Sequence, residues 1–117
     1  MFKVAVATVV LVALGGVGAP LAVADTNPAY DQCGEAAYVT GLYTDLFNGK
    51  PPADTGGAAR RAQAYADNAP AELTKDGHDL TQAEIAVLNG ASTDALRTDP
   101  AIQAWGDVLD WHTSHCS

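Results

Sequence analysis

Apolar side chains recur at helical spacing over most of the chain after residue 30. Within residues 31–47 they form one stripe with the spacing i, i+3, i+4, i+7 and i+8: Val39, Leu42, Tyr43, Leu46 and Phe47. This period predicts an amphipathic helix from about Asp31 to Phe47. Asn48-Gly49 predicts the end of that helix, and Pro51-Pro52 prevents it from restarting.

A second helix is expected to begin near Asp54 or Thr55, since either residue can cap it, and to end before Pro70. Its predicted buried face is made of small side chains and one tyrosine: Ala58, Ala59, Ala62, Tyr65, Ala66 and Ala69. Small residues on a helix face allow a neighbouring helix to approach closely. The second helix is therefore expected to pack tightly in a bundle.

The pattern over residues 71–89 is less uniform. Gly77-His78-Asp79 predicts an interruption, because glycine weakens a helix interior. Thr81 and Glu84 have the spacing of a capping box, which would start a new helix at this point. Asn89-Gly90 predicts its end, and residues 92–97 can add one further helical turn.

The last predicted helix has the clearest boundaries. Asp99 is expected to be its cap and Pro100 to occupy its first turn. Its expected core stripe is Ile102, Trp105, Val108, Leu109 and His112. The pattern as a whole predicts an all-α domain, a bundle of three or four helices.

Residues 1–24 differ from the rest of the chain. They carry one charge, Lys3, followed by an apolar run and a Gly/Pro stretch, and they close on Ala22-Val23-Ala24. This layout predicts a signal peptide cleaved after Ala24, which leaves residues 25–117 as the helical domain. An uncleaved N-terminal anchor is the alternative, because residues 4–24 are long enough to span a bilayer. We therefore expect a secreted or cell-envelope protein with no stable membrane insertion after cleavage.

Composition supports the helical prediction and limits the partners. The chain of 117 residues has 14 Asp and Glu against 6 Lys and Arg, a net charge of -8. Such acidity disfavours nucleic acid, whose phosphates require basic groups, and it disfavours docking on anionic lipid. After residue 24, alanine dominates the apolar side chains and β-branched residues are few, which favours helix over strand.

The two cysteines, Cys33 and Cys116, lie at opposite ends of the predicted domain. An exported chain meets an oxidising compartment, so a disulfide between them is expected. A metal site or a reactive thiol is the alternative. His112 and His115 are three residues apart on the last predicted helix and are weak candidates for a metal or haem ligand. A histidine near a helix C-terminus also interacts favourably with the helix dipole, so no metal and no cofactor is expected.

Enzyme signatures are weak. His78-Asp79 resembles the His-Asp pair of small exported phospholipases over two residues only, without a preceding calcium loop. Arg60 and Arg61 point about 100° apart on a helix, so they do not converge on a dicarboxylate as a chorismate mutase would require. No nucleophile motif of serine hydrolases is present. We expect no catalytic residues.

Several short motifs at predicted helix boundaries occur along the chain in the same order as in a known group of proteins. These are Ala69-Pro70-Ala71-Glu72-Leu73, then Asp99-Pro100-Ala101-Ile102-Gln103-Ala104, and finally Trp111 and His115-Cys116. With the early Cys33, the chain resembles a broad group of small exported or lipid-anchored helical proteins of actinobacteria. The resemblance implies an exported helical domain and no particular activity. His115 before the last cysteine and the absence of a lipidation cysteine depart from the group, and the second departure points to release from the membrane.

These observations favour a non-enzymatic protein that binds another protein or a component of the cell envelope. The alternative is a protein that binds a small apolar ligand or haem between its helices, using His112 or His115 with a nearby tyrosine.

Overall fold

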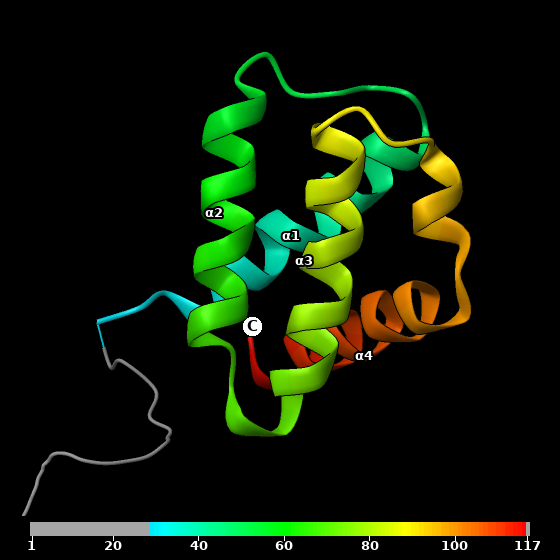
Figure 1. The fold of residues 1–117 in the computed structure, drawn as a ribbon. Helices are drawn as coiled ribbons and strands as arrows, with labels where there is room; N and C mark the ends of the chain where they lie inside the picture. The colour runs from blue at the N-terminus through cyan, green and yellow to red at the C-terminus, as the bar shows by residue number, and fades with distance from the viewer. Residues whose placement is uncertain (1–28, 117) are drawn as a thin grey trace, which may run out of the picture. The chain divides into compact units, whose positions relative to one another are not determined.

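The computed structural model describes residues 29–116 (Figure 1). The chain divides into two units, Met1–Tyr30 and Asp31–Ser117, and only Ala29 and Tyr30 of the first unit are described. The predicted signal peptide, with Ala22 and Ala24, therefore lies outside the described residues. The elements of the second unit are α1 (Gln32–Phe47), α2 (Thr55–Asn68), the 3-10 helix η3 (Ala71–Leu73), α3 (Thr74–Leu88), the 3-10 helix η4 (Thr93–Arg97) and α4 (Asp99–His115). The described residues contain no strand, which confirms the all-α prediction.

The four helices pack as a small bundle. In Figure 1, α2 and α3 lie side by side, α1 lies behind them, and α4 crosses their lower end. α1 and α4 run in opposite directions, because the start of α1 meets the end of α4 at the Cys33–Cys116 disulfide. At the other end of α1, the Tyr43 hydroxyl donates a 2.5 Å hydrogen bond to the Leu96 carbonyl, shortly before α4 begins.

The disulfide predicted from the sequence is confirmed. Cys33 and Cys116 are bonded with their Cα atoms 5.7 Å apart, and both thiols are consumed. A reactive thiol or a metal site built on either cysteine is therefore ruled out in the oxidised protein. No helix within residues 29–116 is both long and apolar enough to cross a bilayer.

The predicted boundaries of the first two helices are confirmed at their caps. The Asp31 carboxylate accepts a 2.9 Å hydrogen bond from the Gly34 N–H, and Asp54 does the same for Gly57. Each bond satisfies a backbone donor that has no partner inside the helix. Gly49, with φ of 73°, supplies the left-handed turn after α1 that only glycine adopts without strain.

The predicted interruption at Gly77 is wrong. α3 runs unbroken from Thr74 to Leu88, and Gly77 is buried on the side that faces α2. A Cβ at Gly77 would lie 3.1 Å from the Ala69 Cβ and 3.5 Å from the Tyr65 ring. The glycine therefore serves the close approach of α2 and α3. The helix-propensity cost of about 1 kcal/mol is outweighed by this packing.

The capping box predicted at Thr81 and Glu84 is also wrong. Both residues lie inside α3 and are 0% exposed. The buried positions Gly77, Leu80, Thr81 and Glu84 are spaced i, i+3, i+4 and i+7 along the helix. They form its core stripe, so two polar side chains occupy positions where apolar ones are usual.

α4 differs from prediction in its cap and in its core stripe. Thr98, rather than Asp99, caps the helix by accepting a hydrogen bond from the Ala101 N–H. The buried residues are Ala101, Ala104 and Val108. The larger apolar side chains of the predicted stripe, Ile102 and Leu109, are 47% and 37% exposed. α4 thus packs its small side chains against the bundle and leaves large ones outside.

A clamp of three side chains joins α1 to α2. The Arg61 guanidinium makes bidentate hydrogen bonds of 2.7 and 3.0 Å to the Glu35 carboxylate and lies 3.8 Å above the centre of the Tyr38 ring. The clamp is on the surface, where the Arg61 side chain is 49% exposed. It therefore orients α1 relative to α2 and contributes modestly to stability, as exposed ion pairs do.

Replacing Arg61 with alanine should lower the free energy of unfolding by about 0.5–1 kcal/mol, because solvent screens an exposed ion pair. Urea unfolding followed by circular dichroism would measure the change. Arg60→Ala, one position along the same helix, is the matched control and should change the free energy of unfolding little. Arg61→Lys should recover only part of the loss, since lysine cannot make the bidentate contact. Equal effects of the Arg60 and Arg61 variants would contradict this account.

Candidate functional site

The two histidines proposed as weak ligands lie at the end of α4. The His115 Nδ1 makes a 2.9 Å hydrogen bond with the Trp111 carbonyl, and its ring stacks on the Trp111 ring at 4.4 Å. His112 is half-buried one turn earlier. Within residues 29–116, no three His, Cys, Asp or Glu side chains are grouped so that they could hold a metal ion. A single pair of histidines supplies two of the four ligands of a structural zinc site.

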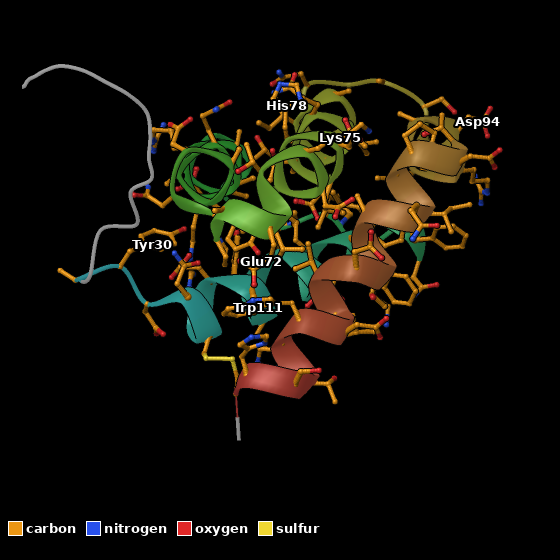
Figure 2. The ribbon with its side chains drawn as sticks, turned by 90° about the horizontal axis from the view of Figure 1, so that it is seen from below. Tyr30, Glu72, Lys75, His78, Asp94 and Trp111 are labelled. Carbon is orange, nitrogen blue, oxygen red and sulfur yellow. A yellow bond between two sulfur atoms is a disulfide. The ribbon has the colours of Figure 1, made fainter. Side chains whose placement is uncertain are left out.

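The His78-Asp79 pair lies far from these histidines. Figure 2 shows His78 and Lys75 on the side of the molecule opposite Trp111 and the disulfide. The His78 Nδ1 is 4.0 Å from the Asp79 carboxylate, which also pairs with Lys75. Both His78 and Lys75 are exposed on α3. The arrangement is a surface charge cluster.

Glu84 is the most unusual side chain in the core. Its residue is 0% exposed, and neither carboxylate oxygen has a hydrogen-bond partner among the described residues. Burial, with no compensating charge, raises the pKa of Glu84 well above its ordinary value of 4.5. The side chain is therefore kept as the neutral acid over a pH range in which an exposed glutamate is ionised.

Two tyrosines of α1 are close enough to Glu84 for its charge to act on them. Burial raises the pKa of Tyr38 and of Tyr43, and the charge that Glu84 carries when ionised raises both further. Arg61 acts on Tyr38 in the opposite direction, and Arg97 does so on Tyr43. Neither cation lowers the pKa of Glu84 itself. The buried Glu84 side chain of α3 therefore has no cation that stabilises its ionised form.

A second carboxyl pair bridges α3 and α4 nearer the surface. The pKa of Asp76 is raised by burial, by the charge of Asp107 and by a hydrogen bond between the two carboxyls. A hydrogen bond between carboxyl groups requires that one of them hold a proton. Gln103 donates a further hydrogen bond to Asp107.

An aromatic cluster lies beside Glu84, where α1 meets α4. The Tyr43 ring stacks on Trp105 of α4 at 5.5 Å and on Phe47 at 6.0 Å. The Trp105 Nε1 is buried and has no hydrogen-bond partner among the described residues. The Arg97 guanidinium lies 4.6 Å from the Phe47 ring centre and also contacts Asp94. The cluster therefore extends from the core to the surface.

Two ring contacts and the spacing along α4 place the exposed apolar side chains near one another. Tyr43 of α1 stacks on Phe47 and on Trp105 of α4. Ile102 lies three residues before Trp105 and Leu109 four residues after it, on the same side of α4. Phe47, Ile102 and Leu109 therefore lie around this junction of α1 and α4.

The outer edge of this junction is apolar and open. Phe47, Ile102 and Leu109 are 40%, 47% and 37% exposed, and they are the large hydrophobic side chains with the greatest exposure among the described residues. We call this surface the seam face and define it by Phe47, Ile102 and Leu109.

Glu84 and the seam face differ in what can reach them. Glu84 is sealed from solvent, so no substrate reaches it without an opening of the bundle. The seam face presents apolar contacts without a nucleophile, an acid or a base.

Sequence reasoning missed both features. Glu84 was assigned to a helix cap, although its spacing from Leu80 and Thr81 placed it on the core stripe of one continuous helix. Ile102 and Leu109 were assigned to the core, although Ala101, Ala104 and Val108 form an alternative stripe at i, i+3 and i+7. The period alone does not distinguish two overlapping stripes, one of small and one of large residues.

Comparisons with known proteins leave the chain without an assigned family. No family model matches it, and no curated protein and no solved structure matches it.

Proposed function

We propose that this chain is an exported, non-enzymatic binding protein of the cell envelope or extracellular space, and that it binds a protein partner through the seam face. The observation that carries the proposal is the exposure of three large apolar side chains around the junction of α1 and α4, Phe47, Ile102 and Leu109. Burying apolar surface gains about 25 cal/mol per Å². A partner that covers these side chains would therefore recover stabilisation that the isolated bundle forgoes.

Export is supported by two separate features. The sequence of residues 1–24 has the layout of a cleaved signal peptide. The Cys33–Cys116 disulfide fits a protein that folds in an oxidising compartment. Intact-mass analysis of protein from the culture medium should give the mass of residues 25–117 less two hydrogens. A mass that retains residues 1–24 would contradict the cleavage.

Site-specific photocrosslinking would test the binding proposal. A photoreactive amino acid at Ile102 or Leu109 should crosslink one and the same protein in the secreting culture. The same probe at Gln63, an exposed position on α2, should not. Ile102→Glu should abolish the crosslink from position 109, whereas Gln63→Glu should leave it intact. Crosslinks of equal yield at positions 102 and 63 would sink the proposal.

A further inference from the structure

Asparagine is followed by glycine at two places in the described chain, and each place is the end of a helix. Asn48 follows the last residue of α1, Asn89 follows the last residue of α3, and both are exposed. Glycine has no Cβ, so nothing on it shields its backbone nitrogen from the asparagine side chain before it. An Asn-Gly step can therefore react with itself by closing a five-membered ring.

This ring closure needs no enzyme and no reactant besides water. The glycine nitrogen attacks the asparagine Cγ and loses its proton, the bond from Cγ to the side-chain nitrogen breaks, and that nitrogen leaves with the proton as ammonia. Water then opens the ring at one of its two carbonyl carbons. Attack at Cγ gives aspartate, and attack at the main-chain carbonyl gives isoaspartate, in which the chain runs through the former side chain. Either product carries a new carboxylate.

The folded helix ends hold both asparagines away from ring closure. ψ is 10° at Asn48 and 9° at Asn89. The ring forms only when Cβ and the glycine nitrogen lie on the same side of the Cα–C bond, so ψ must turn far from these values. The attacking nitrogens are also occupied, because Gly49 and Gly90 donate hydrogen bonds of 3.1 and 3.0 Å to carbonyls in the last turns of their helices. The reaction therefore requires a local opening of the helix end.

The two helix ends are alike within the cap itself. Gly49 and Gly90 have φ of 73° and 106°, the left-handed conformation that glycine supplies at such caps. The next residue closes each cap with a second hydrogen bond to its helix, of 2.8 Å from Lys50 and 2.9 Å from Ala91. Any difference between the two asparagines must therefore come from the chain beyond the cap.

The segment after Asn48 is weakly held. Residues 48–51 are exposed, and the chain crosses the end of the bundle before α2 begins at Thr55 (Figure 1). Two prolines follow Lys50 and have no N–H, so they add no hydrogen bonds that hold the segment to α1. Turning the backbone after Asn48 therefore breaks the two cap bonds and disturbs no helix beyond them.

The segment after Asn89 is held at both ends. Three residues separate Asn89 from η4, and the Ser92 Oγ caps η4 by accepting a 3.2 Å hydrogen bond from the Asp94 N–H. Leu96 anchors η4 in the core and is 0% exposed. Turning the backbone after Asn89 therefore pulls on η4, and it costs more free energy than the same movement at the end of α1.

We propose that Asn48 is a site of spontaneous covalent modification, at which ring closure onto Gly49 and hydrolysis convert the asparagine to aspartate and isoaspartate as the folded protein ages, while Asn89 is largely protected. The inference is independent of the proposed function. The new carboxylate lies at the C-terminal end of α1, where the negative end of the helix dipole disfavours it. The modification therefore weakens the end of α1, next to Phe47 of the seam face.

Peptide mapping of aged protein by mass spectrometry tests the proposal. The oxidised protein is kept folded near neutral pH, and the ratio of acid to amide is followed over time at positions 48 and 89. Conversion at position 48 should be at least about fivefold faster than at position 89. In urea with reductant the two rates should agree within about twofold, because no fold then distinguishes Asn-Gly-Lys from Asn-Gly-Ala.

Two variants at one position separate the reaction from its effect. Asn48→Gln would need a larger ring, so it should abolish conversion at position 48 and leave the rate at Asn89 unchanged. Asn48→Asp reproduces the aspartate product and should melt about 1–5 °C lower than the unmodified protein, because its charge meets the helix dipole. The aged aspartate form, separated by ion exchange, should melt with this variant.

Three outcomes would overturn the inference. Equal or faster conversion at position 89 in the folded protein would show that η4 does not restrain Asn89. Conversion at neither position in the folded protein, with both reacting in urea, would show that the caps protect both asparagines. A preference for position 48 that persists unchanged in urea would assign it to local sequence rather than to the fold. None of these outcomes bears on the seam face, whose test is the crosslink.

Discussion

Replacing Cys33 and Cys116 together with serine should lower the free energy of unfolding by about 4 kcal/mol. The disulfide closes a loop over a sequence separation of 83 residues. Chain-entropy arithmetic for a loop of this length gives about 4.5 kcal/mol at most, because the bridge removes many conformations from the unfolded chain. A domain of this size loses about 4–8 °C of melting temperature per kcal/mol, so the variant should melt about 15–30 °C lower.

The effect is a large share of the total stability because the core is small. Several of its fully buried side chains are alanines, including Ala36, Ala62 and Ala104, which contribute little apolar area. The exposed position of Ile102 and Leu109 reduces the core further. The junction of α1 and α4 therefore depends on the disulfide at one end and on the Tyr43–Leu96 hydrogen bond at the other. Losing the bridge frees the end of α4 from α1.

Thermal unfolding by circular dichroism, with and without reductant, would measure this effect. Reduced wild-type protein should melt at the temperature of the double-serine variant, and reductant should not change the variant itself. That agreement separates the loss of the bridge from any effect of the serine side chains. A fall of only a few degrees on reduction would show that the helices hold α1 against α4 without the disulfide.

Local signals in the sequence predicted much of the fold. Asp31 and Asp54 each precede a helical pattern and accept a hydrogen bond from the first turn, so both caps were predictable. Gly49 and Gly90 end their helices with positive φ, as glycine after asparagine suggests. The disulfide followed from the cysteine count and the expected compartment.

The features that sequence reasoning missed depend on packing between helices. Gly77 predicts a break when only its own helix is considered, and its role becomes visible once Ala69 and Tyr65 of the α2 region lie against it. Which of two stripes on α4 faces inward depends on how closely α3 approaches, and Ala101 and Ala104 allow the closer contact. Local propensity carries no information about either neighbour. The exposure of the seam face and the burial of Glu84 both depend on which sides of α4 and α3 pack inward.

Replacing Glu84 with leucine should stabilise the protein at pH 7 by about 2 kcal/mol. The change removes a buried polar group that has no hydrogen-bond partner among the described residues and puts an apolar side chain of similar size in its place. Most core substitutions destabilise a protein, so a gain in stability for Glu84→Leu would indicate that the buried carboxyl is unsatisfied. Urea unfolding at several pH values would measure it. A loss of stability in Glu84→Leu at pH 7 would contradict the view that the acid is unsatisfied.

The pH dependence of this gain gives a stricter test. In the unfolded chain Glu84 ionises near its ordinary value of 4.5, whereas burial raises the pKa of the folded side chain well above it. Between these two values unfolding releases a proton. The free energy of unfolding therefore falls as the pH rises above about 4.5, by up to about 1.4 kcal/mol per pH unit. Below 4.5 the carboxyl is protonated in both states, and the penalty is absent.

Glu84→Gln separates charge from shape, because the amide is neutral at every pH and nearly isosteric with the acid. Asp76 has a pKa raised by burial and by Asp107, so it gives the protein a slope of the same sign in every variant. The informative quantity is the stability difference between wild type and Glu84→Gln, which should widen in favour of glutamine as the pH rises from 4.5. Glu72→Gln, at an exposed position in η3, should show no such widening. A difference that stays constant from pH 4 to pH 8 would mean that Glu84 ionises in the folded protein as readily as in the unfolded chain, and it would contradict the raised pKa expected from the complete burial of this side chain.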